Sequence, residues 1–392
     1  MTSPPLAVAP PLALTEDRLA WLALALTPQL GPRRILRAVE RVGGTPSRIL
    51  SLSLTELEAL QFPAESVRFI FDGAARRAAD QQIEELAKTG AGFLAYTDDA
   101  YPERLREIFD PPALLWIRGN AQLLAQPSIA VVGTRHPTPY GTGMAEMLSR
   151  DLANCGLIIL SGMARGVDTS AHRGALAAKR PTIAVWGTGV DVVYPKENQS
   201  LAQQIVAEGG AILSELPLGT FPAPQNFPKR NRILSGMSVG VLVIEAAEYS
   251  GTRVTARCAL EQNRDVFAVP GNVTTKNAWG PNTLIKQGAK LTATWEDVWE
   301  DLPTPVRLQL ESQRGSESNS EPPASLFQQE PLPANEARIM GVLRHDEALQ
   351  LDEIMEKLEP ELSSSEIFTA LFELELAGRV RQLPGKNYVK TF

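Results

Sequence analysis

Cysteine and histidine are scarce in this sequence of 392 residues, which contains two cysteines and three histidines. Cys155 and Cys258 form no C-x-x-C motif, and each lies within an apolar helical pattern, so we interpret both as reduced core cysteines. His136, His172 and His345 are scattered and form no cluster with metal-ligand spacing. The sequence therefore gives no indication of a disulfide framework or a metal site.

Long apolar runs are also absent. No run approaches the ~20 residues that a membrane helix requires. The first eleven residues have no basic segment and are interrupted by Pro4, Pro5, Pro10 and Pro11, which is not typical of a signal peptide or an anchor. We therefore expect a soluble cytoplasmic protein, with residues 1–13 as a disordered leader.

Two common phosphate-binding motifs are missing as well. The turn that begins at Gly133 and continues through Arg135 to Gly143 does not contain G-x-G-x-x-G, and its Arg-His-Pro occupies the place where a backbone approaches a pyrophosphate. The chain has no Walker A lysine motif either. We therefore expect no nicotinamide, flavin or nucleoside triphosphate cofactor.

The sequence instead contains a series of short apolar runs that end at glycine or at polar residues. Runs that are apolar throughout predict strands covered on both faces, and the amphipathic stretches between them predict the covering helices. We therefore predict an α/β fold, a Rossmann-like, doubly wound and mostly parallel sheet. The predicted strands are residues 129–132, 157–162, 182–187, 211–216, 239–245 and 265–269.

Charge is distributed unevenly along the chain. The formal net charge is −7, yet residues 129–290 carry sixteen Lys and Arg against eleven Asp and Glu, a net of +5 that leaves −12 for the rest. A basic core between acidic flanks favours an anionic ligand.

The residues that follow the predicted strands are suited to phosphate binding. Ligands of open α/β sheets lie at the carboxyl ends of strands, where turn amides, helix N-termini and arginines bind anions. Phe227 beside three cations and an amide is also typical of single-strand binding, in which bases stack while phosphates are neutralised. The alternative is that Phe227 fills the core and the cations cap the sheet. The candidate residues are Gly133, Arg135, Ser161, Gly162, Arg165, Gly166, Phe227, Lys229, Arg230, Asn231, Arg232, Ser250, Gly251 and Thr252.

Catalytic alternatives involve few residues. Asp168 and His172 are four residues apart and fit one helix face, but no third, orienting group is evident, and both also suit structural hydrogen bonding. Glu245 and Glu248 are the other carboxylates near a candidate site.

The flanks predict smaller domains. Residues 14–80 form a helical domain in which Gly31 lies in a turn between two helices, as in a helix-hairpin-helix, SAM-like unit; a plain helical packing module is the alternative. Residues 81–300 form the extended Rossmann-like domain, and the Pro-, Ser- and Glu-rich residues 301–335 a disordered linker. Residues 336–392 predict a winged helix, with an N-cap at Ser363 and a wing around Pro384 and Gly385. Residues 338–392 have seven basic and ten acidic side chains, so we expect this domain to contact protein rather than duplex DNA.

Together these motifs closely resemble the DNA-processing protein A family, DprA or Smf, over about residues 101–291. The motifs that carry the resemblance are VVGTR (131–135), SGMARGVD (161–168) with His172, DVVYP (191–195), SE (214–215), FPKRNR (227–232), Glu245 with Ser250-Gly251-Thr252, VPG (269–271) and NTLI (282–285). The resemblance implies a homodimer without enzymatic activity that binds and protects single-stranded DNA and loads RecA recombinase onto it in natural transformation.

The same sheet also looks like that of the lysine-decarboxylase-like nucleotide phosphoribohydrolases. Those enzymes have a glycine-rich loop and a glutamate, whereas here Ala246 to Thr252 lack the glycine run. This enzyme class is the alternative function.

Overall fold

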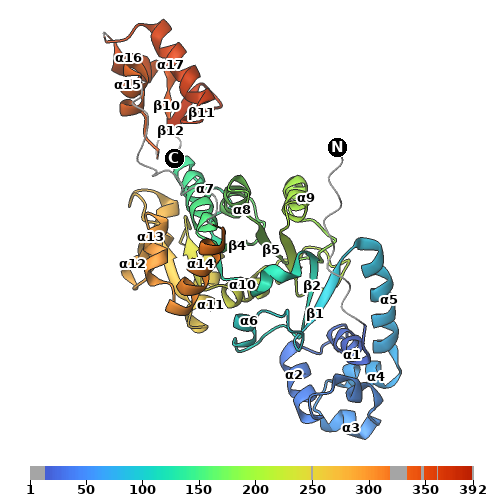
Figure 1. Ribbon diagram of the computed structural model, residues 1–392. Helices are drawn as coiled ribbons and strands as arrows, with labels where there is room; N and C mark the ends of the chain where they lie inside the picture. The colour runs from blue at the N-terminus through green and yellow to red at the C-terminus, as the bar shows by residue number, and fades with distance from the viewer. Residues whose placement is uncertain (1–13, 249, 318–332, 346–347, 360, 391–392) are drawn as a thin grey trace.

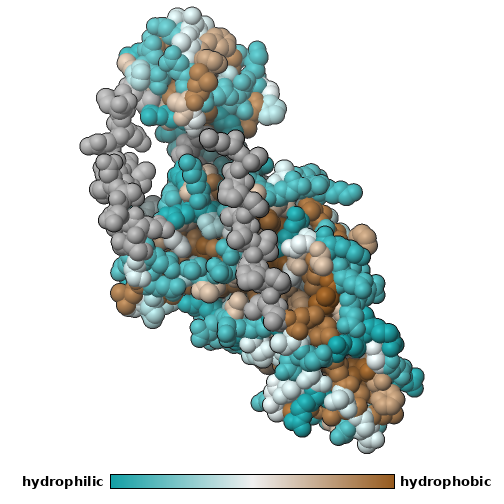
Figure 2. Space-filling view, turned by 45° about the vertical axis from the view of Figure 1, so that its right-hand side comes forward, coloured by the Kyte–Doolittle hydropathy of each residue, from teal (hydrophilic) through white to brown (hydrophobic). Residues whose placement is uncertain are grey.

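The computed structural model describes residues 14–248, 250–317, 333–345, 348–359 and 361–390 (Figure 1). Three parts follow one another along the molecule: an N-terminal helical unit at one end, a large α/β domain in the middle, and a small C-terminal domain at the other end (Figures 1 and 2). In the described residues, no helix has both the length and the apolar character needed to cross a membrane.

A nine-stranded sheet in the order β1-β2-β6-β5-β4-β3-β7-β8-β9 forms the middle domain. The pairs from β6 to β9 are parallel, whereas β2 pairs antiparallel with both β1 and β6. The predicted mostly parallel, doubly wound sheet is confirmed. Its strands are β1 (Gly92–Ala95), β2 (Leu114–Gly119), β3 (Ser128–Val132), β4 (Ile158–Ser161), β5 (Thr182–Trp186), β6 (Ala211–Ser214), β7 (Gly240–Val243), β8 (Asp265–Ala268) and β9 (Lys290–Leu291).

Both faces of the sheet are covered by helices, which explains the continuous apolar runs. On β3, Ile129 packs on one face in a cluster with residues of α7 and α8, and Ala130 packs on the other face with residues of α10 and α11. The first face is covered by α7 (Pro139–Asn154), α8 (Val167–Ala177), α9 (Gln199–Ala207), α13 (Trp295–Asp301) and α14 (Thr304–Glu317), and the second by α6 (Glu103–Arg106), α10 (Asn226–Met237), α11 (Thr252–Glu261) and α12 (Trp279–Lys286).

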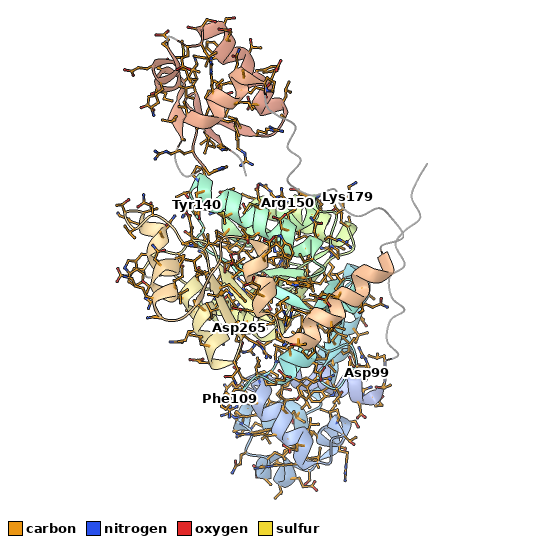
Figure 3. All side chains as sticks on the ribbon, turned by 60° about the vertical axis from the view of Figure 1, so that its left-hand side comes forward. Asp99, Phe109, Tyr140, Arg150, Lys179 and Asp265 are labelled. Atoms are coloured by element: carbon orange, nitrogen blue, oxygen red, sulfur yellow. The ribbon has the colours of Figure 1, made fainter. Side chains whose placement is uncertain are left out.

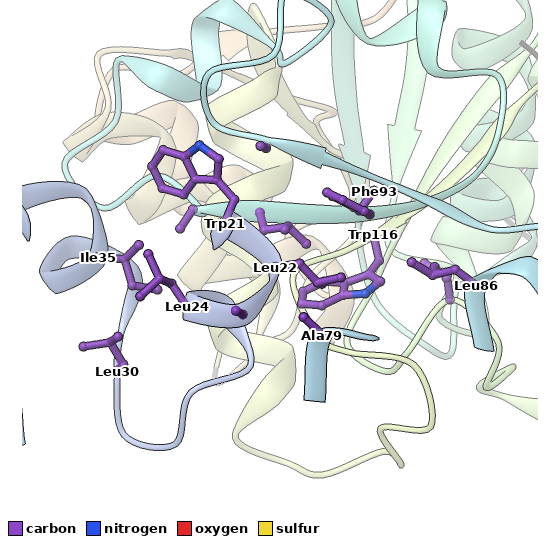
Figure 4. Close-up of a cluster of buried hydrophobic side chains, with 14 of the residues drawn as sticks. Trp21, Leu22, Leu24, Leu30, Ile35, Ala79, Leu86, Phe93 and Trp116 are labelled. Atoms are coloured by element: carbon purple, nitrogen blue, oxygen red, sulfur yellow. The ribbon is translucent and has the colours of Figure 1, made fainter. Parts of the chain in front are cut away.

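The N-terminal helices share one hydrophobic core with the edge of this sheet. Trp21 and Leu22 pack in a cluster with Phe93 of β1 and Trp116 of β2 (Figure 4). The predicted boundary between residues 80 and 81 falls inside α5, so the chain is helical across it. The helices are α1 (Glu16–Ala25), α2 (Pro32–Arg41), α3 (Leu54–Ala59), α4 (Ala64–Phe71) and α5 (Ala74–Thr89).

The prediction of a disordered linker over residues 301–335 is wrong for its first part. Residues 304–317 form α14, because Val306 and Leu310, four residues apart, are buried against the face that α7 covers. Residues 318–332 and the predicted leader, residues 1–13, lie outside the described residues.

The C-terminal domain is the predicted winged helix. Ser363 caps α17 with its hydroxyl, and Glu366 binds back to the Ser363 amide, as the N-cap prediction requires. The wing is formed by β11 and β12, which pair antiparallel. The elements are α15 (Ala334–Val342), β10 (Leu349–Gln350), α16 (Leu351–Leu358), α17 (Ser364–Leu376), β11 (Val380–Leu383) and β12 (Asn387–Lys390).

Candidate nucleic-acid interface

A cavity of about 620 Å³ opens where the strand order reverses. After β3 the chain builds β4, β5 and β6 on one side, then returns to place β7 on the other side of β3. The loops after β3 and β7 run in opposite directions from neighbouring carboxyl ends of the sheet. A crevice therefore opens between these loops, and this is where ligands usually bind in such sheets. The cavity is lined by Val132, Gly133, Thr134, Arg135, His136, Ala164, Asp168, Tyr194, Pro224, Phe227, Pro228, Arg230, Asn231, Leu234, Ala247, Ser250, Gly251, Thr252, Val254 and Thr255.

The loop from β3 to α7 places Arg135 at the rim. Its far end is held by the buried carboxylate of Glu245, which accepts hydrogen bonds from the Thr138 amide at 2.9 Å and the Thr138 hydroxyl at 2.5 Å. An anion at the first turn of α7 also suits the helix dipole. The loop is therefore anchored, and the exposed Arg135 projects from a fixed base.

Phe227 brings an aromatic ring to the same rim. The sequence interpretation placed its motif after a strand, and the structure places it in the first turn of α10. The ring centroids of Phe227 and Tyr194 are 5.5 Å apart, and the guanidinium carbon of Arg135 lies 6.0 Å from the centroid of Phe227. A Cβ at Gly187 would lie 2.9 Å from the Phe227 ring, so glycine leaves the space that the ring occupies. Two aromatic rings and an arginine thus share the mouth of the cavity.

Arg230 and Asp168 form a buried, charged layer beneath the rim. Arg230 donates from Nη1 to the carbonyl oxygen of Val185 at 2.6 Å. Burial lowers the pKa of Arg230 to about 10, so its guanidinium remains charged at neutral pH. Burial raises the pKa of Asp168, and the positive charge of Arg230 opposes that rise. The floor of the cavity therefore contains a buried, charged arginine next to a buried carboxyl group.

The Gly162 amide has a partner within the protein. That amide donates to Oδ2 of Asp168 at 3.1 Å, and the Ala164 amide donates to the same oxygen at 3.2 Å. Gly162 has a different role, because a Cβ there would lie 1.9 Å from Nη1 of Arg230. Gly166 has a φ of +78°, and a Cβ there would meet the Thr134 carbonyl oxygen at 2.5 Å. These glycines allow close packing.

His172 does not pair with Asp168. It is fully buried, and its Nδ1 hydrogen-bonds with the hydroxyl of Thr182 at 2.8 Å. Burial, together with the charge of Arg230, lowers the pKa of His172 to about 3, so the ring is neutral at physiological pH. Its place between helix and sheet favours the structural alternative.

The start of α11 forms the opposite wall. Ser250, Gly251 and Thr252 all line the cavity, and the Ser250 hydroxyl accepts a hydrogen bond from the Thr252 amide at 3.1 Å. Glu245, two positions after the last residue of β7, lines a different cavity of about 570 Å³ together with Tyr140 and Asn272. The carboxylate and the Ser-Gly-Thr segment therefore do not face one ligand.

Ten of the candidate residues lie around two adjoining hollows. Arg135, Phe227 and Arg230 border both the main cavity and a smaller one of about 40 Å³. The main cavity also contains Gly133, Asn231, Ser250, Gly251 and Thr252, and the smaller one Gly162 and Arg165.

The other four candidates, Ser161, Gly166, Lys229 and Arg232, do not line either hollow. Ser161 is buried and donates to the Val131 carbonyl oxygen at 2.7 Å. Arg232 is 13% exposed and forms ion pairs with Asp110 at 2.9 Å and Glu215 at 2.6 Å. Lys229 is exposed on α10. Two carboxylates therefore already neutralise Arg232, whereas Lys229 is accessible to an anionic ligand.

Sequence reasoning missed Tyr194 and His136 as lining residues. Tyr194 belongs to the DVVYP motif, and this pattern was the available signal. Arg165, which is 59% exposed, forms an ion pair with Glu197 beside the smaller hollow, a contact that no sequence pattern predicts. No cluster of three or more metal-ligating side chains occurs in the part of the chain that the structure describes.

Comparison with known proteins agrees with these features. A family model described as DNA recombination-mediator protein A matches residues 92–303, and a model described as DprA winged helix domain matches residues 321–386. Protein Smf of Escherichia coli is 37% identical over 316 residues, which cover 80% of this chain and 81% of Smf.

Two further similarities involve Streptococcus pneumoniae. Its DNA processing protein DprA is 45% identical over 270 residues, which cover 68% of this chain and 92% of that protein. The X-ray structure of DNA processing protein A from the same species superposes with a TM-score of 0.62 at 34% identity, covering 74% of this chain and 99% of that structure.

Proposed function

Because the chain belongs to the DNA recombination-mediator protein A family, we propose that it binds single-stranded DNA in the cavity between the β3 and β7 loops. In this function it protects incoming DNA and loads RecA recombinase onto it during natural transformation. It works in the cytoplasm as a homodimer, joined through the Rossmann-like domain.

The observation that carries the proposal is the composition of the cavity mouth. Phe227 and Tyr194 offer ring faces, and Arg135 lies 6.0 Å from the Phe227 centroid. Base stacking on aromatic rings contributes about 1–3 kcal/mol per base and is independent of sequence, while arginine neutralises the adjoining phosphate. A duplex hides its base faces, so this arrangement favours single strands.

A binding function also accounts for the site better than the phosphoribohydrolase alternative. Enzymes of that class have a glutamate together with their glycine-rich loop, whereas here Glu245 lines another cavity and accepts hydrogen bonds from Thr138. Release of free base from nucleoside monophosphates would contradict our proposal and favour the enzyme.

The direct test is a titration with single- and double-stranded oligonucleotides in the same buffer at several salt concentrations. We expect tighter binding to the single strand, with an affinity that falls steeply as salt rises. Phe227→Ala and Arg135→Ala should each weaken single-strand binding by about 1–3 kcal/mol while the melting temperature stays close to that of the wild type.

Arg173→Ala is the matched control, because Arg173 is exposed on α8 and does not line the cavity. Equal affinity for both forms of DNA would contradict the proposal. So would a Phe227→Ala variant that melts much earlier yet binds normally once folded, since Phe227 would then be a core residue.

A further inference from the structure

A second group of arginines lies outside the cavity, on α2 of the N-terminal unit. This helix of ten residues contains Arg33, Arg34, Arg37 and Arg41, with Glu40 as its acidic side chain. Arg34, Arg37 and Arg41 are exposed and spaced three and four residues apart, so they share one face of the helix. Among the described residues, no ion pair joins any of the four arginines to a carboxylate. The helix therefore presents a positively charged stripe, about 10 Å long by the helical rise, to an outside partner.

An exposed aromatic ring lies beside this stripe. Phe109, in the segment between α6 and β2, is 77% exposed, and Figure 3 shows it at the junction of the N-terminal unit and the α/β domain. The guanidinium carbon of Arg33 lies 3.8 Å from the centroid of its ring. A single exposed apolar residue is ordinary. A ring backed by one arginine and next to a stripe of three others is the combination that binds bases and phosphates together.

The acidic side chains close to Phe109 in the sequence are neutralised by arginines of the α/β domain. Asp110, the neighbour of Phe109, pairs with Arg232 at 2.9 Å, and Arg232 follows Asn231, which lines the cavity. Glu107 pairs with Arg264 at 2.9 Å. Neither Asp110 nor Glu107 is therefore an unpaired negative charge close to Phe109.

We propose that α2 and Phe109 form a second contact for the same single strand of DNA. A base stacks on the free side of Phe109, and successive phosphates bind Arg34, Arg37 and Arg41. This inference rests on the proposed function, because it follows the strand after it leaves the cavity. It gives the N-terminal unit a role in lengthening the binding site.

The test compares a short oligothymidylate of about 6 nucleotides with a long one of about 30, since single-strand sites span about 4–16 nucleotides per domain. The variant Arg34→Gln/Arg37→Gln/Arg41→Gln should bind the short oligonucleotide as the wild type does. It should bind the long one about tenfold or more weakly, with a log-log salt slope smaller by about 2, because each phosphate contact contributes about 0.7.

The matched control is Arg48→Gln/Arg68→Gln/Arg77→Gln, which removes the same charge from exposed positions on other elements of the unit. It should keep the affinity of the wild type for both lengths. Phe109→Ala should weaken only the long oligonucleotide, and the single reversal Arg37→Glu serves if the triple variant does not fold.

Two results would overturn the inference. The first is an α2 variant that binds the long oligonucleotide as tightly as the control does, which would indicate that the stripe binds an acidic protein instead. The second is a loss of affinity that is equal for the short and the long oligonucleotide. A wild type that does not bind the short oligonucleotide contradicts the proposed function itself, so the two failures are distinguishable.

Discussion

The rim of the cavity and the layer beneath it use the same residue types for different purposes. In the FPKRNR motif, Lys229 is exposed, whereas Arg230 is buried against the Val185 carbonyl oxygen and Arg232 is held by Asp110 and Glu215. The cause is the helix, because successive residues of α10 point in directions about 100° apart. Cations that are clustered in sequence are therefore divided between surface and interior.

This difference determines whether a mutation in each region changes stability or affinity. Changes in the buried layer disturb hydrogen bonds and charges that have no access to water, so they alter the free energy of unfolding. Changes at the rim leave the folded core intact and alter affinity.

The largest expected effect is a dependence of stability on pH that arises from His172. Burial lowers the pKa of His172 in the folded state from 6.5 to about 3. The neutral ring therefore stabilises the fold fully above pH 6.5, and this contribution to the free energy of unfolding is lost as the pH falls toward 3. One proton changes the free energy of unfolding by about 1.4 kcal/mol per pH unit, which gives about 2.5 kcal/mol between pH 7.5 and 4.5. Urea unfolding of wild type and His172→Asn at both pH values measures it.

Asparagine keeps a polar atom near the position of Nδ1 but does not titrate. The stability gap between wild type and variant should therefore narrow as the pH falls. A gap that stays constant would show that His172 is accessible to protons in the folded protein and does not belong to the buried layer.

The division between rim and buried layer also explains what could be predicted from the sequence. The strands were predicted well because burial on both faces leaves apolar runs, as in Ile129 to Val132. The partners of Arg232 could not be predicted, since Asp110 is 122 positions away in the sequence and only the packing of α6 on α10 brings it close. Helix α14 was not predicted because the composition of residues 301–335 is mostly polar. Its two buried residues, Val306 and Leu310, are too few to form a recognisable helical pattern.

A smaller effect should distinguish the two partners of the exposed pair beside the small hollow. Arg165 and Glu197 are 59% and 61% exposed, so their ion pair adds little stability. If Arg165 contacts a phosphate, Arg165→Ala should weaken single-strand binding by about 1 kcal/mol, and Glu197→Gln should strengthen it because the competing carboxylate is gone. Fluorescence anisotropy with a labelled oligonucleotide, at low and moderate salt, measures both. Two variants with the affinity of the wild type would show that the pair is only a surface salt bridge.

The smallest effect is expected from removal of residues 318–392, which include the winged helix. Residues 338–392 carry seven basic and ten acidic side chains, and α17 exposes Phe368, Phe372 and Leu376 in place of cations. One ion pair joins this domain to α7 among the described residues, between Arg381 and Glu146 at 3.6 Å, and exposed pairs of this kind contribute about 0–1 kcal/mol. Single-strand affinity should therefore stay within about threefold of the full chain, because phosphate neutralisation dominates binding.

The truncation ends after α14, since Leu310 is fully buried and a cut at residue 302 would expose the core that it covers. That shorter chain is the informative control: it should melt earlier, whereas the chain ending at residue 317 should not. A hundredfold loss of affinity in the stable truncation would place a main DNA contact on the winged helix, in spite of its net negative charge.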